Sequence, residues 1–120
     1  MRYDINQPIL GLTGETLKGL FGKDDDRVIT YAALFTLVSA NGLPDDKAEE
    51  KYTSFKMGVQ FANTLTGALV DIDDKGSVRL KKIIAANYTP TIYGRVVDFL
   101  DNPVVEKASL LPLLDHLAAE

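Results

Sequence analysis

The pattern of apolar and polar residues predicts a central helix from Asp26 to Ala40. Nearly every position from Val28 to Val38 is apolar, which is typical of a helix that is buried on all sides. The aspartates before this run suit the positive end of the helix dipole, and one of them could cap it. The following Asn-Gly pair favours a left-handed stop.

A second helix is predicted from Pro44 to Leu65. Apolar residues recur there at steps of three and four, so they form one stripe on the helix. We expect this stripe to face the core. Its members are Ala48, Tyr52, Phe55, Val59 and Ala62, with Met57, Phe61 and Leu65 beside them.

Two more helices are predicted from the local signals at their ends. One runs from Lys75 to Asn87, and the next begins at Pro90 with Thr89 as its cap and ends before an Asn-Pro pair. A fifth helix is predicted in the C-terminal stretch VVEKASLLPLLDHLAAE, bent or interrupted by Pro112.

The N-terminal residues 1–23 differ from the rest. The stretch QPILGLTGETLKGLFGK carries four glycines and a proline, which favours an extended arm or a short hairpin turning at Thr13-Gly14. An isolated hairpin is marginal in water, so the arm should lie on the body or on a neighbouring subunit. The sequence thus predicts one mainly α domain over residues 1–120, with four to five helices around a central apolar helix and this arm.

The core should be built from apolar residues of several helices. The fourth helix should bury Tyr93, Val96, Val97 and Leu100, and its Gly94 should offset the cost of a helical glycine by allowing close approach of another backbone. The residues expected to be buried include Phe35, Phe55, Val59, Ile84, Val96 and Leu100.

The segment VDIDDKGSVRLKK begins like a calcium-binding loop. Asp71, Asp73 and Gly76 stand where an EF-hand loop places its first two carboxylates and its turn glycine. That loop also needs oxygen ligands at positions 5 and 12, and here both are lysines. We therefore predict no metal site, and expect Asp73 or Asp74 to cap the helix that follows.

Composition and charge narrow the classes of function. The chain has 120 residues and no cysteine, which excludes disulfides and thiolate chemistry. A formal net charge of −4 gives no overall attraction to nucleic acid or anionic membranes. The N-terminus lacks the apolar core of a targeting peptide, and the apolar runs are far shorter than a bilayer span. We expect a soluble, cytoplasmic protein.

Three cations on the third predicted helix form a short stripe. Lys75, Arg79 and Lys82 are spaced by four and three residues, so they share one helix face. Such a face could meet nucleic-acid phosphate, but it is short and has no interleaved aromatic residues. A solvated face is the favoured interpretation, a partner-binding face comes next, and a nucleic-acid accessory role is kept as the alternative function.

No catalytic constellation is visible. His116 is the only imidazole and lies in the leucine-rich C-terminal stretch. No G-x-S-x-G motif occurs, and GLTGETLKG lacks the Gly-Lys-Ser/Thr end of a phosphate-binding loop. We predict no catalytic residue, no metal and no cofactor. An enzyme of an unrecognised type is the third hypothesis.

The order of these features resembles that of a group of small uncharacterised proteins encoded by tailed phages and prophages. Their pattern opens with a D-x-N-x-P-I arm and a glycine turn, and closes with a Y-(S/T)-P-x-(I/V)-x-G-x-(I/V)-x-(D/E)-x-L helix. The approach GKDDDRVIT and the tail after Asn102 depart from that pattern. The matching segments are YDINQPILGLTGE (Tyr3–Glu15), VDIDDKGSVRLKKII (Val70–Ile84) and YTPTIYGRVVDFLD (Tyr88–Asp101).

The resemblance implies a non-enzymatic viral protein that acts in the cytoplasm of an infected bacterium or on the virion. It brings no catalytic residues. The leading function is interaction or assembly, in particle morphogenesis or a host-directed accessory role. The expected partners are the protein itself and another phage or host protein.

Self-association is predicted from an excess of apolar residues at both ends of the chain. Pro112 prevents the C-terminal leucines from packing on one body, and the arm is too weak to stand alone. Apolar patches of this kind usually mark interfaces, and a two-fold dimer is the commonest solution. The candidate interface residues are Ile9, Leu10, Leu12, Leu110, Leu113, Leu114 and Leu117.

Overall fold

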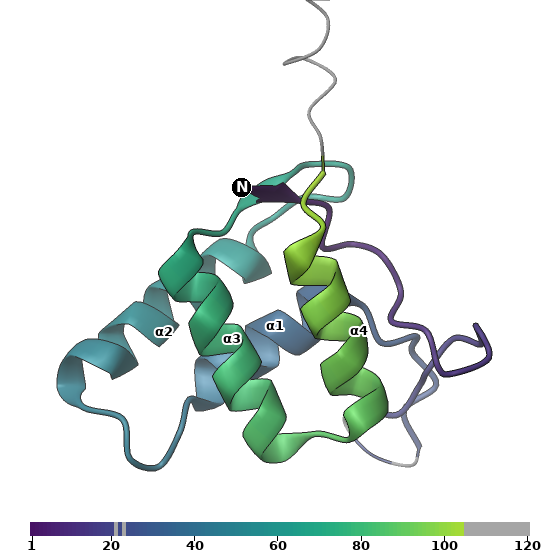
Figure 1. Ribbon diagram of the computed structural model, residues 1–120, viewed down its shortest axis with the longest axis horizontal. Coiled ribbons are helices and arrows are strands. Elements are labelled where there is room, and N and C mark those ends of the chain that lie inside the picture. Colours follow the sequence, from purple (N-terminus) through teal and green to yellow (C-terminus); the bar gives the residue numbers. More distant parts are fainter. Residues whose placement is uncertain (21, 23, 105–120) are drawn as a thin grey trace, which may run out of the picture.

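The computed structural model describes residues 1–20, 22 and 24–104, and the predicted fifth helix lies outside this part of the chain. A short antiparallel ladder joins β1 to β2, with Arg2 opposite Asp71. In Figure 1, α3 lies between α2 and α4, and α1 lies behind α3 and α4. The mainly α prediction is confirmed. The elements are β1 (Arg2–Tyr3), α1 (Tyr31–Asn41), α2 (Ala48–Ala62), β2 (Val70–Asp71), α3 (Asp74–Asn87) and α4 (Pro90–Asp101).

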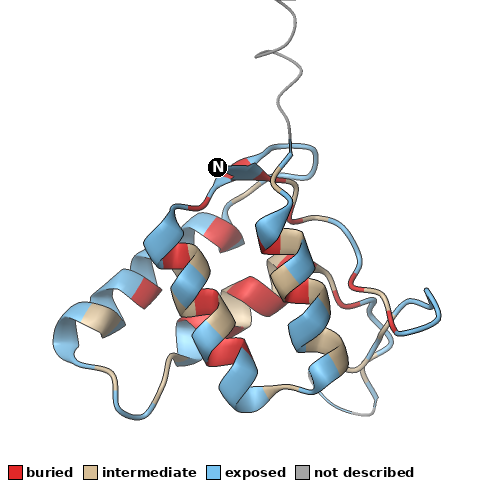
Figure 2. Cartoon of the chain, in the orientation of Figure 1, coloured by how far each residue is buried: buried red, intermediate tan, exposed pale blue. Residues whose placement is uncertain are grey.

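The core is centred on α1. Phe35 of this helix is fully buried, and its ring contacts Phe61 of α2 and Phe99 of α4 at centroid distances of 5.6 and 5.9 Å. Tyr31 stacks on Phe99 at 4.0 Å. Aromatic contacts of this kind add to the stabilisation from burial itself. Figure 2 shows the buried residues concentrated on α1 and on parts of α3 and α4, whereas much of α2 is exposed.

The N-terminal arm belongs to the core of its own chain. Tyr3, Ile5 and Ile9 are buried, and the Tyr3 hydroxyl donates a hydrogen bond of 2.6 Å to the carbonyl of Leu100. Burial raises the pKa of Tyr3 above its usual value. The sequence predicts that the arm lies either on the body of the protein or on a neighbouring subunit. In the structure it lies on the body of its own chain.

The predicted turn in the arm is present and is fixed from α4. The Gly11 amide donates to the Glu15 carbonyl at 2.7 Å across the turn, and Gly14 has a φ of 86°, which favours glycine. Arg95 of α4 donates to the carbonyls of Leu10 and Gly11 at 3.1 and 2.6 Å. The Arg95 side chain therefore satisfies two backbone carbonyls of the arm, a segment that makes few hydrogen bonds within itself.

The first helix begins at Tyr31 rather than at residue 26, and its cap is Thr30 rather than an aspartate. The preceding residues run extended because their backbone is paired on both sides. The Ile9 amide donates to the Ile29 carbonyl at 2.8 Å, and the Ile29 amide donates to the Leu17 carbonyl at 2.7 Å. β-Branched residues suit such pairing better than a first helical turn. The extended segment therefore reaches residue 30, beyond the predicted end of the arm.

The third and fourth helices follow the prediction closely. Asp73 caps α3, where its carboxylate accepts a hydrogen bond of 2.7 Å from the Gly76 amide. Thr89 is the N-cap residue of α4, and Pro90 is its first residue. Tyr93 of α4 is 37% exposed, so it is not part of the buried face as predicted. The expected core residues Phe35, Ile84, Val96 and Leu100 are all buried.

The predicted buried face of α2 is wrong. Phe55 and Val59 are 62% and 46% exposed, and Tyr52 is exposed as well. Of the residues predicted beside this stripe, Phe61 is buried as expected and Met57 packs against the core, whereas Leu65 is exposed. The helix is turned this way because buried Ser54 accepts a 2.6 Å hydrogen bond from Arg79 of α3, which draws a polar residue inward. The helix is also shorter than predicted at both ends, running from 48 to 62.

The prediction for Gly94 is also wrong. This residue is exposed, and a Cβ placed on it would have no atom within 4 Å. Close approach of two backbones occurs instead at Gly58 of α2. A Cβ there would lie 3.5 Å from the Cβ of Ser39 and 3.8 Å from the amide nitrogen of Ala40. The missing side chain at Gly58 is what lets α2 lie directly against α1.

Phe61→Ala should lower the free energy of unfolding by ~3–5 kcal/mol, the usual cost of truncating a buried phenylalanine. Phe55→Ala on the same helix serves as the matched control and, at a protein concentration low enough to keep the chain monomeric, should cost well under ~1 kcal/mol, because its ring is largely in water in the single chain. Urea denaturation of both variants measures the difference. Equal losses would contradict the orientation of α2.

The two helical glycines should respond in opposite ways to a larger side chain. Gly58→Leu should destabilise the protein by ~1–3 kcal/mol or more, since the side chain would push α2 away from α1. Gly94→Leu should be neutral or stabilising by up to ~1 kcal/mol, because it replaces a poor helix former at an open position. Thermal unfolding of the pair tests this. A destabilised Gly94→Leu variant would mean that α4 packs more closely than described.

Candidate functional site

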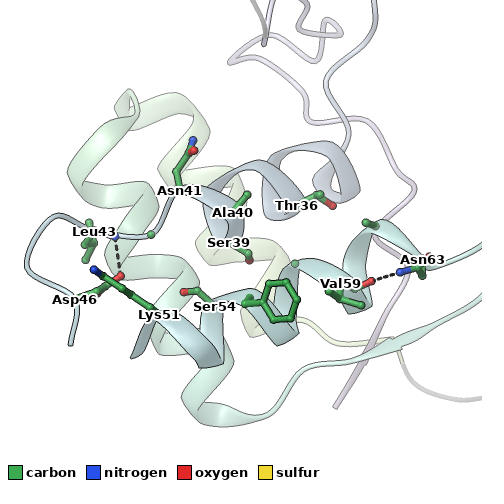
Figure 3. A pocket seen from close by; sticks show the side chains of 14 residues that line it. Thr36, Ser39, Ala40, Asn41, Leu43, Asp46, Lys51, Ser54, Val59 and Asn63 are labelled. Atoms are coloured by element: carbon green, nitrogen blue, oxygen red, sulfur yellow. Dashed lines mark hydrogen bonds between the residues drawn. The ribbon is translucent and has the colours of Figure 1, made fainter. Parts of the chain in front are cut away.

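One concave surface of the described residues is a largely apolar groove between α1 and α2, with a volume of about 540 Å³ (Figure 3). One side is formed by residues of α1, and the other by the outer residues of α2. We call this surface the α1–α2 groove. The residues that define it in the argument below are Thr36, Ser39 and Ala40 from α1, with Phe55, Val59 and Ala62 from α2.

The floor of the groove is set by the close contact at Gly58. Because the helices meet there without an intervening side chain, Ser39 is almost completely buried beneath the groove. Its hydroxyl has no hydrogen-bond partner among the described residues. A buried hydroxyl without a partner costs stability, so the interface of α1 and α2 is not optimised for stability alone.

Two aromatic side chains extend the apolar surface along α2. Tyr52 and Phe55 lie with ring centroids 6.3 Å apart and ring planes inclined at 28° to each other. The ammonium of Lys56 lies 4.9 Å from the centre of the Tyr52 ring, a favourable cation–π contact. These contacts limit the freedom of the exposed rings before anything binds them.

The exposed charge that lines the groove is positive. Lys51 lines it and is exposed, whereas the exposed Lys56 lines a separate depression on the side of α2 that faces β2. Asp46 also lines the groove, but its carboxylate is paired with Arg79 and is only 2% exposed. The surface therefore offers apolar contact with one lysine at its edge.

The position of α2 beside the groove depends on a buried ion pair. The Arg79 guanidinium donates to both carboxylate oxygens of Asp46, to the hydroxyl of Ser54, and lies 3.6 Å from a carboxylate oxygen of Glu50. Asp46 also accepts a 2.8 Å hydrogen bond from the Leu43 amide. One side chain of α3 thereby holds the α1–α2 loop and α2 together.

This arrangement makes the carboxyl group of Asp46 more acidic. The hydrogen bonds from Arg79, followed by the one from the Leu43 amide, lower the pKa of Asp46 from 3.8 to about 2. Both donors favour the ionised form. The carboxylate therefore stays charged throughout the physiological range.

The predicted cationic face is present but contains carboxylates. Lys75, Arg79 and Lys82 line one open depression between α2 and α3. The same depression is lined by Glu49, Glu50 and Asp74. Arg79 is engaged in the ion pair with Asp46. The described geometry thus gives a surface of mixed sign, whereas phosphate binding favours a single-signed one.

The acidic residues of the predicted calcium-like loop have structural partners. Asp71 pairs with the N-terminal ammonium at 2.9 Å, and this partner lowers the pKa of Asp71. Asp73 is the cap of α3. Among the described residues, no group of three or more His, Cys, Asp or Glu side chains is arranged to hold a metal ion.

The predicted interface residues differ in their exposure to solvent. Ile9 is in the core, Leu10 is half-buried, and Leu12 is 82% exposed at the tip of the arm. The predicted residues Leu110, Leu113, Leu114 and Leu117, as well as His116, lie outside the described residues. Sequence reasoning missed the groove, although it found the apolar stripe that forms its α2 side.

The chain was compared with known proteins at the levels of sequence and fold. No protein-family model, curated protein or solved structure matches it. In the part of the chain that the structure describes, no helix has the length and apolar character needed to cross a membrane.

The ion pair should make stability depend on acid. Because the folded pKa of Asp46 is depressed to about 2, its contribution is present above the unfolded value of 3.8 and is lost as the pH falls through the folded value. Asp46→Asn removes this contribution. The stability difference between the two proteins should therefore be largest near neutral pH and shrink from about pH 5 to pH 2.

Urea midpoints measured across that range give the difference directly. Asp45→Asn, a change at the exposed neighbouring position, is the control. A constant difference between wild type and Asp46→Asn would show that Asp46 does not act through its ionised carboxylate.

Proposed function

We propose that this protein is a non-enzymatic phage protein of interaction or assembly, and that it associates with itself through the α1–α2 groove. The phage context is supported by the resemblance carried by the arm and the fourth helix. The mode of action is supported by the chemistry of the groove, which offers apolar contact area from Phe55, Val59 and Ala62 beside polar side chains such as Asn41 and Asn63. Such a surface suits a protein segment.

The observation that carries the proposal is the exposed apolar stripe of α2. Phe55, Val59 and Tyr52 fall at helical spacing, as a buried face would, yet they are 62%, 46% and 61% exposed. Burying a large apolar side chain is worth ~1.5–3 kcal/mol. A contiguous face of this kind leaves a substantial stabilisation unrealised in the isolated chain.

A second copy of the chain is the occupant that the sequence itself supplies. The C-terminal stretch holds five leucines between positions 110 and 117, and the described core is already closed without them. The same chain therefore has an apolar acceptor surface and a surplus of apolar side chains. Pairing of two copies would cover the acceptor surface of each copy with apolar side chains of the other. A two-fold axis closes such an assembly at a dimer.

Light scattering of the full chain at tens of micromolar should give the mass of a dimer. Phe55→Ser combined with Val59→Ser should weaken the association by at least about tenfold, since each side chain contributes more than the ~1.4 kcal/mol that a factor of ten requires. Val78→Ser, on α3 and 65% exposed, is the matched control and should leave the mass unchanged.

Circular dichroism should show that all variants keep their helices, because the substituted residues lie outside the core. A monomeric full chain would refute self-association. A dimer that tolerates the double substitution in α2 would place the interface elsewhere.

A further inference from the structure

We infer that the occupant of the α1–α2 groove is the C-terminal segment, residues 105–120, of a second copy of the chain. This inference rests on the proposed self-association and specifies which part of the partner enters the groove. It is argued from the chemistry of the segment, from the place where the described chain ends, and from the side of α2 on which the groove lies.

The segment matches the groove in apolar character. Its sequence VEKASLLPLLDHLAAE has leucine at five of the eight positions from 110 to 117. The groove presents Phe55, Val59 and Ala62 on one side and Ala40 on the other. Leucine side chains filling this surface would also cover Tyr52 and complete the burial that the stripe on α2 predicts.

The charges are complementary as well. The segment contains Glu106, Asp115 and Glu120 against a single cation, Lys107, so it is acidic. The edge of the groove carries one exposed lysine, Lys51. Apolar contact with opposite charges at the rim is the usual pattern of a specific protein interface.

The described chain ends beside the strands, on the opposite side of α2 from the groove. The Val104 amide donates to the Arg2 carbonyl at 2.8 Å, and Arg2 is paired with Asp71 of β2. Gln60 of α2 donates from its side chain to the Asp71 carbonyl at 3.1 Å, so this face of α2 points to the strands. Gly58, which lines the groove, is two positions away and therefore points to the other side of the helix.

The linker to the leucines is short for a path around α2 in the same chain. The six residue steps from Val104 to Leu110 span at most about 20–22 Å, so a same-chain path would need this stretch to be fully extended. The route from Val104 past β1 and β2 includes strand spacings of about 5 Å each, and it then has to pass a helix that is about 10–12 Å wide. A second copy related by a two-fold axis can present its segment directly, and each copy then fills the groove of the other.

Cross-linking in the full chain tests this inference, because the natural chain has no cysteine and any disulfide must come from introduced residues. Chains carrying Val59→Cys are mixed with chains carrying Leu114→Cys, allowed to exchange subunits, and mildly oxidised. The expected result is a disulfide-linked dimer of the two different chains. Val78→Cys mixed with Leu114→Cys is the control and should give severalfold less product, because Val78 lies on α3 outside the groove.

Three other outcomes overturn the inference. A double variant that links only within one chain would show that the segment docks on its own body. A dimer by light scattering with no link between positions 59 and 114, or between 59 and 110, would leave the proposed self-association standing and place the segment elsewhere. A monomeric full chain would remove both proposals.

Discussion

The rotation of α2 depends on one buried guanidinium. Arg79 reaches from α3 to Asp46, Glu50 and Ser54, and these partners fix which side of α2 faces inward. Burying a charge without its partner is strongly destabilising, so Asp46, Glu50 and Ser54 must all lie next to Arg79 in the folded chain. The apolar stripe of α2 faces outward, because turning it inward would leave the Arg79 guanidinium buried without its hydrogen-bond and ion-pair partners. The groove is the structural result of that choice.

The N-terminal arm has a comparable role on the other side of the molecule. Its residues supply a fully buried part of the core, and Arg95 of α4 holds its turn by two backbone carbonyls. With only short β-bridges of its own, the arm is ordered by contacts with α1 and α4. Among the described residues of the arm, Leu12 at the tip of the turn is the most exposed large apolar side chain, because Tyr3, Ile5 and Ile9 are taken into the core.

The parts that could be predicted from sequence are those decided by local chemistry. The start of α4 follows from the fixed backbone of Pro90, and the start of α3 follows from the capping carboxylate of Asp73. The start of α1 could not be found this way, because Ile29 is held extended by residues 20 and 12 positions earlier in the chain. The groove was missed because periodicity identifies an apolar face but not its neighbour. Only the position of Arg79 decides that this face lies outside.

The hydrogen bond between Tyr3 and Leu100 joins residues that are 97 positions apart. Contacts of such high sequence separation carry a large entropic cost of loop closure and slow the folding of a small domain. We therefore expect the first residues of the arm to dock late, once α4 has formed on the rest of the helical body. Before that step Tyr3 would lack its Leu100 partner, and the strand pairing of the arm would be open to other chains. On this view the first element of the sequence is among the last to settle.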